Sequence, residues 1–396
     1  MNASNQTLHV AGLFAGIGGF EIGLARADHQ TVLLCEKDEM AQLVLKEKFR
    51  NIPLSADVAD LAALPDVDLV CAGFPCQNLS MAGDKKGLAG AKSGIVSHLF
   101  RLLEGQRVPW VVIENVYFML HLQNGSGIAG VLDPLEALGY RWAYRVVDSR
   151  SFGLAQRRRR VFIVASTSND PRQVLLADER VDKSLPQVDL GHPIGFYWTE
   201  GKSGHGLTGN AIPPLKAGSA LGIPSAPAVL LPNGRVAVPP IQVAETLQGF
   251  ETDWTAALDQ AGCGRYRWRL VGNAVSVPVA EWIGRRLQAP AFYDASQDRP
   301  LPAGAKWPNA AWNMGTGRHA SGASAFPVET PLGRLADMDT NDWPDLSEKA
   351  LGGFLRRARA SNLRYPTGFL DALESHLARL AVSSIAGLRT GERHIR

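Results

Sequence analysis

One short segment constrains this chain more than any other: an apolar run, Leu69–Ala72, that ends in Gly73 and leads into Pro75-Cys76-Gln77. A short apolar run bounded by turn residues is typical of a buried parallel strand. In an open parallel sheet the ligand crevice lies beyond the carboxyl ends of the strands. Cys76 would then lie on a loop at that crevice, where a nucleophile is expected. Free cysteines are more often small buried apolar residues, so this segment alone favours a structural cysteine.

The N-terminal segment has the pattern of a cofactor site. An apolar strand, Leu8–Leu13, runs into the loop Phe14-Ala15-Gly16-Ile17-Gly18-Gly19-Phe20 and then into a helical pattern, Glu21–Ala27. Glycine allows the backbone to approach a ligand, and the helix N-terminus offers free N–H groups. The spacing is not that of the dinucleotide fingerprint, because position 21 is Glu. A glycine cluster of this kind is also often no more than a tight turn.

Acidic residues follow the next strands. Thr31–Leu34 leads to Glu36, about 20 positions after the glycine loop, which is where a ribose diol is bound in nucleotide folds. A solvated surface acid is the alternative interpretation of Glu36. The next segment, 52–58, contains Asp57, which could reach an adenine amino group. A later strand, Val108–Ile113, ends in Glu114-Asn115-Val116. Each acid therefore lies at the end of an expected strand.

The remaining elements complete an α/β pattern. Candidate helices cover 40–49, 95–104, 132–138, 241–247 and 279–287. Strands at 142–147 and 161–165 flank the run Gln156-Arg157-Arg158-Arg159-Arg160. Alternating strands and helices suit the open parallel sheet expected around Leu69–Ala72. Adjacent arginines usually form a phosphate-binding or solvated patch, but these abut a buried strand, so one or two could point into the crevice.

Three stretches break this pattern. Residues 77–98 are rich in Gly, Ser and Lys, and a loop of this length beside a nucleophile could act as a lid. Residues 168–235 lose their periodicity, which indicates a separate small domain of irregular structure. Residues 290–396 are expected to be loop-like to about position 340 and then helical over 347–359 and 368–380, with Asp345 or Ser347 capping the first helix. The arginines of these helices indicate either a solvated helix pair or an extra phosphate clamp: Arg356, Arg357, Arg359 and Arg364.

Composition narrows the class of protein. A chain of 396 residues exceeds a usual single core, so two or three domains are expected. A net charge of +3 neither requires nor excludes nucleic acid. The cysteines, Cys35, Cys71, Cys76 and Cys263, fit no metal pattern or disulfide framework and indicate thiols in a reducing cytoplasm. No apolar run is long enough to cross a membrane, and the polar N-terminus lacks the features of a signal peptide.

A set of segments in one order resembles the DNA (cytosine-5) methyltransferases of restriction-modification systems: the glycine loop, Glu36, Asp57, Pro75-Cys76-Gln77, Glu114-Asn115-Val116, Gln156–Arg160 and Gly272-Asn273. The resemblance covers 8–166 and 236–288. It implies an α/β, doubly wound, Rossmann-like domain that binds S-adenosyl-L-methionine, formed by 1–167 and 236–289. It also implies a small irregular target-recognition domain at 168–235. The C-terminal extension, 290–396, lies outside the family core and receives no role by analogy.

The same resemblance implies the reaction. A methyl group would pass to carbon 5 of a cytosine that has been flipped out of double-stranded DNA. Cys76 would add to carbon 6 as a thiolate, which is the reactive form of the side chain. Glu114 would contact N3 and the exocyclic amino group, and Arg158 and Arg160 would line the pocket. Arg157 and Arg159 would meet phosphates or solvent.

The cofactor site is implied in the same way. Glu36 would take the ribose hydroxyls, and Asp57 and Val58 would hold the adenine. A loop carrying Gln77 and Ser80 would close over the flipped DNA. No metal is expected. The other expected cofactor contacts are Phe14, Ala15, Gly16, Ile17, Gly18, Gly19, Gly73, Pro75, Leu99, Asn273 and Ala274.

The chain departs from the family pattern at a few positions. Ala155 stands where Pro is usual, Gln242 and Thr246 stand where arginines are usual, and Leu270 stands where Gln is common. None of these changes removes a catalytic group.

Three alternatives stay open. An RNA cytosine-5 methyltransferase would share the fold, although the inserted region at 168–235 favours DNA. A non-catalytic DNA-binding relative would be expected to lose Cys76, Glu114 or Arg160, and all three are present. A dehydrogenase with a cysteine nucleophile is disfavoured by the glycine spacing. The expected partners are double-stranded DNA and a cognate restriction endonuclease that acts on the same site. We expect a cytoplasmic monomer, and the sequence does not give the recognised DNA site.

Overall fold

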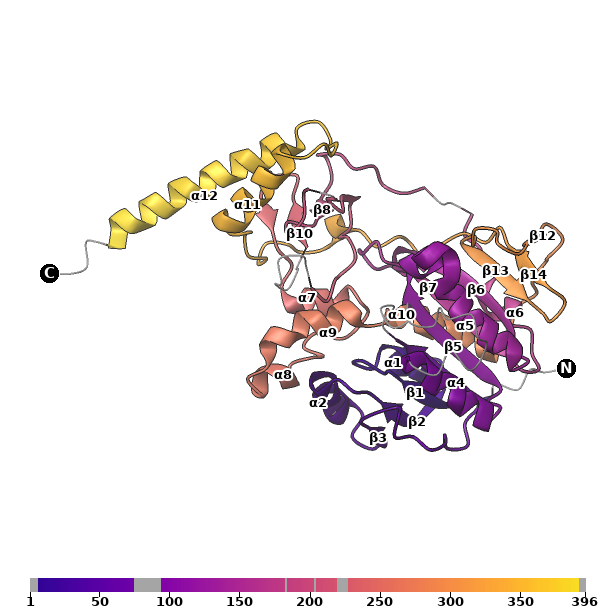
Figure 1. Cartoon of the computed structure of the whole chain (residues 1–396). Coiled ribbons are helices and arrows are strands. Elements are labelled where there is room, and N and C mark those ends of the chain that lie inside the picture. The colour runs from indigo at the N-terminus through magenta and orange to yellow at the C-terminus, as the bar shows by residue number, and fades with distance from the viewer. Residues whose placement is uncertain (1–5, 75–93, 182–183, 203, 219–226, 392–396) are drawn as a thin grey trace.

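The computed structural model describes residues 6–74, 94–181, 184–202, 204–218 and 227–391, with side chains to residue 382 (Figure 1). Its central feature is a ten-stranded sheet in the order β12-β14-β13-β6-β7-β5-β4-β1-β2-β3. The strands are β1 (His9–Leu13), β2 (Gln30–Cys35), β3 (Leu54–Ser55), β4 (Leu69–Gly73), β5 (Trp110–Val116), β6 (Arg141–Asp148), β7 (Arg159–Ser166), β12 (Arg299–Pro300), β13 (Ala310–Asn313) and β14 (Arg318–Ala320).

The sheet has a parallel half and an antiparallel half. β1 pairs in parallel with β2 and β4, β2 pairs with β3, and β4 pairs with β5. Beyond β5 the sheet continues antiparallel through β7, β6, β13, β14 and β12. From the adjacent strands β1 and β4 the chain proceeds to opposite edges, so the topological switch point lies at their carboxyl ends.

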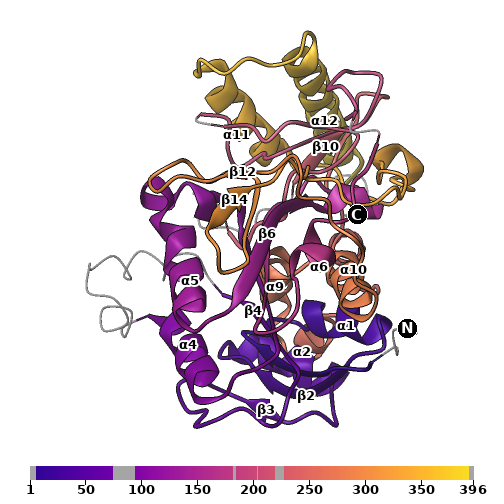
Figure 2. The same cartoon turned by 90° about the vertical axis from the view of Figure 1, so that its right-hand side faces the viewer.

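Helices cover both faces of this sheet, as Figure 2 shows. They are α1 (Gly19–Arg26), α4 (Ile95–Gly105), α5 (Ser126–Ala137), α6 (Arg172–Leu175) and α10 (Val277–Gln288). Ala11 and Val70 face a core shared with α4 and α5, whereas Val10 and Cys71 face a core shared with α1, α6 and α10. Neighbouring strand residues thus point to opposite layers, and the runs are apolar throughout because both faces are buried.

A second lobe is built on a four-stranded sheet in the order β11-β10-β8-β9. Its strands are β8 (Ile194–Phe196), β9 (Thr208–Gly209), β10 (Ala228–Leu230) and β11 (Val236–Ala237). Helices α11 (Glu348–Arg359) and α12 (Phe369–Gly391) belong to this lobe (Figure 1). A third core joins the lobes and includes residues of α2 (Glu39–Lys48), α7 (Ile241–Thr246), α8 (Ala257–Gln260) and α9 (Arg267–Asn273). The short 3-10 helices are η3 (Tyr117–Leu120), η4 (Leu122–Gly125), η5 (Ser149–Phe152), η6 (Gly264–Tyr266) and η7 (Leu335–Asp337).

The doubly wound α/β class is confirmed, and most of the expected strands and helices of 8–166 occur within about three residues of their predicted bounds. The exception is α5, which begins at Ser126 rather than at 132. The cap of α11 is Ser347, whose hydroxyl accepts a hydrogen bond from the Ala350 N–H at 3.4 Å. None of the described helices is long and apolar enough to cross a membrane.

Two stretches differ from expectation. Residues 290–340 were expected to be loop-like, but β13 pairs with β6 and, together with β14 and β12, completes the large sheet. Residues 168–235 were expected to form one separate unit, but Val174 and Leu175 of α6 are buried against the large sheet. The short strands and the single-turn helix have too few residues to show a period, so pairing and packing with distant segments determine them.

Candidate active site

The glycine loop lies at the switch point, between β1 and α1. Phe14, Gly16 and Gly18 have φ values of 57°, 57° and 89°, a left-handed conformation that glycine adopts readily. A Cβ at Gly19 would lie 2.5 Å from the Val275 carbonyl oxygen, so the loop packs closely against the segment before α10. A Cβ at Gly16 would have no heavy atom within 4 Å. The loop therefore leaves open space beside its backbone.

Glu36, directly after β2, holds this loop in place. Its Oε2 accepts a hydrogen bond from the Gly16 N–H at 2.7 Å, and its Oε1 accepts one from the Asp38 N–H at 2.7 Å. Burial raises the pKa of this carboxyl above its ordinary value. Glu36 is thus a half-buried structural contact rather than a free surface acid. Each carboxylate oxygen has a further lone pair that could accept from a ligand hydroxyl.

Asp57 lies beyond β3, near the same edge of the sheet. Its Oδ2 is 2.6 Å from Lys37 Nζ, and this hydrogen bond lowers the pKa of the Asp57 carboxyl. The neighbouring Val58 is buried, and its carbonyl oxygen accepts a hydrogen bond from Arg101 Nη2 at 3.2 Å. Asp57 follows the end of β3 by two residues, and its carboxylate is already engaged by Lys37.

Aromatic and aliphatic groups lie between these acids and β4. The rings of Phe14 and Phe74 meet edge to face, with centroids 6.0 Å apart. Leu99 of α4 is fully buried in the core beneath, so it supports the site rather than lining it. A Cβ at Gly73 would lie 3.9 Å from Glu114 Oε2, which brings the end of β4 next to the end of β5.

Glu114 and Arg160 form an ion pair at neighbouring strand ends. Arg160 lies opposite Val116 in the β5–β7 register, and its Nε is 3.1 Å from Glu114 Oε1. Only 9% of the Glu114 side chain and 14% of the Arg160 side chain are exposed. The contact does not have hydrogen-bond geometry, so within the described chain Glu114 Oε1 is buried without a hydrogen bond. Burial raises the pKa of Glu114, although Arg160 and Arg158 act in the opposite sense.

Arg158 is buried two residues earlier, but its contacts are with backbone. Its Nη1 donates to the carbonyl oxygens of Leu215 and Gly272, each at 3.2 Å, and its Nη2 donates to that of Ala274 at 2.7 Å. The Arg158 guanidinium was expected to line the target pocket, but its hydrogen bonds connect β7 to α9 and to the second lobe. Asn273, by contrast, is exposed and lines the cleft between the lobes.

Two side chains have positioning roles that the sequence did not indicate. Asn115 donates from Nδ2 to the Phe74 carbonyl oxygen at 3.0 Å, one residue before Pro75. Gln156 donates to the Leu247 carbonyl oxygen at 2.9 Å and accepts from the Leu215 N–H at 2.8 Å. Both lie inside motifs that the sequence singled out, but nothing in the motifs gives their partners. Pro75, Cys76, Gln77 and Ser80 lie outside the described residues.

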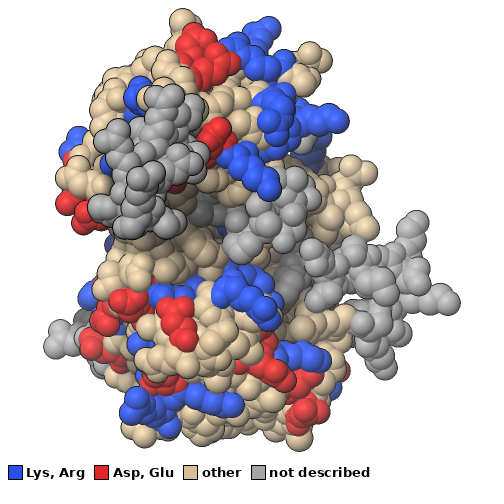
Figure 3. All heavy atoms as spheres, turned by 90° about the vertical axis from the view of Figure 1, so that its left-hand side faces the viewer, with Lys and Arg blue, Asp and Glu red and all other residues tan. Residues whose placement is uncertain are grey.

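A cleft of about 780 Å³ separates the two lobes beside the Glu114–Arg160 pair. Figure 3 shows the hollow between the lobes, with Lys and Arg side chains on both sides of it. Arg157, Arg159 and Arg160 line the cleft, and Arg159 lies over the Tyr117 ring at 4.2 Å. Phe118 is 60% exposed on the same wall. Cations and exposed aromatic rings together suit a nucleic acid, because they contact phosphates and stack on bases.

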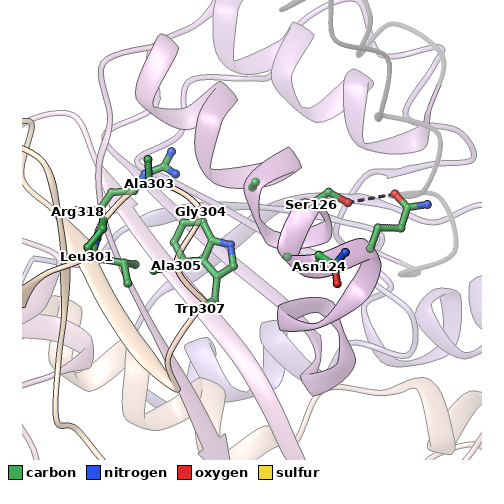
Figure 4. Close-up of a pocket in the computed structure, with 12 residues that line it drawn as sticks. Asn124, Ser126, Leu301, Ala303, Gly304, Ala305, Trp307 and Arg318 are labelled. Atoms are coloured by element: carbon green, nitrogen blue, oxygen red, sulfur yellow. Dashed lines mark hydrogen bonds between the residues drawn. The ribbon is translucent and has the colours of Figure 1, made fainter.

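A second cavity, of about 530 Å³, lies away from this cleft (Figure 4). It is bounded by the start of α5 and by the turn after β12, with the Trp307 indole between them. Its charged residue, Arg318, already pairs with Asp133 and Glu136. None of the predicted site residues that the structure describes lines this cavity. No group of three or more His, Cys, Asp or Glu side chains in the described chain could hold a metal.

A glycine loop at the switch point of a doubly wound sheet, together with a basic cleft between two lobes, is typical of a Rossmann-like enzyme that acts on nucleic acid. Residues 8–193 match the family model of the C-5 cytosine-specific DNA methylases. The chain belongs to this family, and its activity is that of a DNA (cytosine-5-)-methyltransferase of restriction-modification type.

Relatives extend the match over most of the chain. The chain is 42% identical to the Type II methyltransferase M2.BsuMI of Bacillus subtilis, over 93% of this chain and 97% of that one. It is 28% identical to the Type II methyltransferase M.HaeII of Haemophilus aegyptius, over 68% of this chain and 90% of that one. The solved structure of the S. pombe Dnmt2 methyltransferase covers 71% of this chain and 98% of its own, with a TM-score of 0.54 and 16% identity, and shows the fold.

Proposed function

We propose that this chain transfers a methyl group from S-adenosyl-L-methionine to carbon 5 of a cytosine within a specific double-stranded DNA site. The observation that carries this proposal is the Glu114–Arg160 pair. It offers a buried carboxylate oxygen without a hydrogen bond, beside a cation and at the edge of a basic cleft. A buried polar atom costs free energy unless it is hydrogen-bonded, so the site is suited to a ligand with a polar edge. The N3 and amino group of cytosine form such an edge.

The residue types fit the chemistry. Carbon 5 of cytosine is a weak nucleophile, so electrons must be pushed into the ring. In our proposal the thiolate of Cys76 adds to carbon 6, and the charge that this creates is neutralised at N3 by Glu114. Only a protonated carboxyl can donate there, and the raised pKa of Glu114 favours that form. Arg160 would hold the base carbonyl.

The reaction then ends by elimination. A proton leaves carbon 5 to water, its electron pair restores the double bond between carbons 5 and 6, and the Cys76 sulfur departs with the electrons of its bond to carbon 6. N3 then returns its proton to the Glu114 carboxylate, which leaves neutral 5-methylcytosine. The role of Cys76 rests on its sequence motif. The Asn115 hydrogen bond to the Phe74 carbonyl supports it indirectly, because it fixes the backbone two residues before the proposed nucleophile.

The residues at the switch point fit S-adenosyl-L-methionine. The open space at Gly16 suits the methionine part, and the remaining lone pairs of Glu36 suit the ribose hydroxyls. Phe14 and Val58 would supply apolar surface for the adenine, and Asp57 would share its carboxylate between Lys37 and the adenine amino group. When bound, the cofactor supplies an electrophilic methyl group.

The substrate and its role complete the proposal. Carbon 6 of a stacked base is not accessible to a side chain, so the cytosine would be flipped out of the duplex. Methylation of one site would protect host DNA from a cognate endonuclease that cuts there. We further propose that the enzyme acts as a monomer in the cytoplasm.

Methyl transfer with the purified full chain tests this proposal. Duplex DNA and transcribed RNA are each incubated with S-adenosyl-L-methionine carrying a labelled methyl group and then digested to nucleosides. We expect label in 5-methyldeoxycytidine, from DNA only. Label in 5-methylcytidine from RNA would favour the RNA methyltransferase alternative. The cofactor alone should raise the melting temperature, while NAD should not. Stabilisation by NAD would contradict the assigned cofactor.

A further inference from the structure

The C-terminal helices and the small sheet of the second lobe share one core. The Phe196 ring of β8 lies 5.0 Å from the Phe354 ring of α11 and 5.4 Å from the Phe369 ring of α12, centroid to centroid. All three side chains are fully buried. A sheet of two- and three-residue strands is not stable by itself and needs a packed partner. The extension is therefore part of the second lobe and not an appendage.

Backbone contacts bind the same two segments together. The Leu346 N–H donates to the Val236 carbonyl oxygen at 2.9 Å, and the Val238 N–H donates to that of Pro344 at 2.8 Å. The Arg357 guanidinium donates to the carbonyl oxygens of Trp198 at 2.7 Å and Glu200 at 2.8 Å. This arginine thus fixes the backbone that leads into residues 204–208, which line the cleft.

The turn between α11 and α12 reaches the cleft itself. Leu363 lines the cleft together with residues 204–208. Tyr365 orients this turn: its ring lies 5.3 Å from His205, stacks on Phe369 at 5.8 Å, and its hydroxyl donates to the Gly201 carbonyl oxygen at 3.4 Å. The end of the turn is therefore fixed by aromatic contacts, on the wall opposite the arginines of β7.

The two polar side chains next to Leu363 in the sequence have no hydrogen-bond or ion-pair partner in the described part of the chain. Asn362 and Arg364 are exposed, and no hydrogen bond or ion pair joins either side chain to the described part of the chain. Two other arginines of the extension are occupied, because Arg357 holds the backbone and Arg359 pairs with Glu374 at 2.7 Å. A phosphate clamp made of all these arginines is thus disfavoured. Of the exposed donors, Asn362 and Arg364 flank the cleft-lining Leu363, whereas Arg356 lies on α11 and does not line the cleft.

We propose that the turn Ser361–Tyr365 is a specificity-determining part of the DNA-recognition surface, and that it contacts base edges together with residues 204–208. Within the described residues, the recognition unit then consists of 186–202, 204–218 and 227–238 together with 342–382. The proposal rests on the proposed function and on the target-recognition role that the family resemblance implies for 168–235. An amide and a guanidinium are the groups that read adenine and guanine edges in a groove, and Leu363 supplies apolar contact.

Mapping of methylated sites in cells tests the proposal even though the recognised DNA sequence is unknown. The full chain, the triple variant Asn362→Ala, Leu363→Ala, Arg364→Ala and a control are expressed in a host without cytosine methylation, and genomic 5-methylcytosine is sequenced. The control is Glu348→Ala with Lys349→Ala, which are also exposed on the extension but do not line the cleft. The measured quantity is the ratio of methylation at sites with one changed base to methylation at cognate sites. We expect this ratio to be about ten-fold higher in the triple variant than in the unaltered chain, because a base-edge contact has been lost. The control should keep the original consensus.

Each other outcome has a defined meaning. An unchanged consensus in the triple variant overturns the proposal, whether the overall methylation stays constant or falls uniformly as for a phosphate contact. If the triple variant has a lowered melting temperature, the single variants Asn362→Ala and Arg364→Ala replace it, because both side chains are exposed and contribute nothing to the core. Absence of 5-methylcytosine with the unaltered chain would instead contradict the proposed function.

Discussion

At the scale of single residues, Glu114 carries the chemistry that can be tested most simply. Glu114→Gln keeps the shape of the side chain but removes its acidic proton. We expect kcat to fall about 100-fold or more, the range that general acid catalysis supplies, with the affinity for DNA nearly unchanged. Single-turnover methylation and a DNA-binding titration measure the two quantities. A rate close to that of the unaltered enzyme would mean that N3 is neutralised by another group.

A second buried acid, Glu21 of α1, lies beneath the sheet, with its Oε1 3.8 Å from Cys71 Sγ. Burial raises its pKa from 4.5 to about 7. The folded state therefore holds this proton more tightly than the unfolded state, so the stability contribution is present at low pH and is lost as the pH rises through about 7. Glu21→Gln should remove roughly 2 to 3 kcal/mol of the decrease in unfolding free energy between about pH 5 and about pH 8. Urea unfolding at both pH values measures this, and an equal pH dependence in variant and parent would contradict the assignment.

At the scale of elements, the hydrogen bonds of Arg158 join β7 to α9 and to the second lobe. Its guanidinium satisfies three buried carbonyl oxygens, and each unsatisfied polar group costs about 1–3 kcal/mol. We expect Arg158→Ala to unfold the protein or to lower its melting temperature strongly, with Arg158→Lys intermediate. Thermal unfolding distinguishes this from a purely catalytic role, in which kcat would fall while the melting temperature stayed constant.

The same elements show what local sequence can predict. The family resemblance, rather than a local pattern, separates Arg158 and Arg160, which are largely buried, from Arg157, which is exposed. It does not distinguish the role of Arg158 from that of Arg160. Arg158 contacts carbonyl oxygens of residues 215–274, whereas Arg160 pairs with Glu114 of β5, and neither partner can be read from the run of arginines. Apolar runs between turn residues predict β1, β2 and β4. β13 gave no such signal, since Ala310–Asn313 becomes a strand only by pairing with β6, far away in sequence.

At the scale of the whole molecule, the extension 290–396 links the large sheet to the second lobe. A truncation after residue 289 would expose the edge of β6 and would remove Phe354 and Phe369 from the core of the second lobe. Unpaired edges and exposed apolar cores lead to aggregation. We therefore expect little soluble protein from this truncation, judged by gel filtration and circular dichroism against the full chain. A soluble, active fragment would show that the extension is dispensable.

The most direct test of the central claim is covalent trapping. Release from Cys76 requires loss of the carbon 5 hydrogen as a proton, and fluorine cannot leave in that way. Duplex DNA with 5-fluorocytosine at the target should therefore give a denaturant-resistant adduct that carries one added methyl group. Cys76→Ser should give none, because a serine hydroxyl is far less ionised than a thiol near neutral pH and is therefore a poor nucleophile. Variants of the buried Cys35 and Cys71 and the half-buried Cys263 should still be trapped. An adduct that persists in Cys76→Ser, or that peptide mass mapping assigns to another cysteine, would contradict the mechanism.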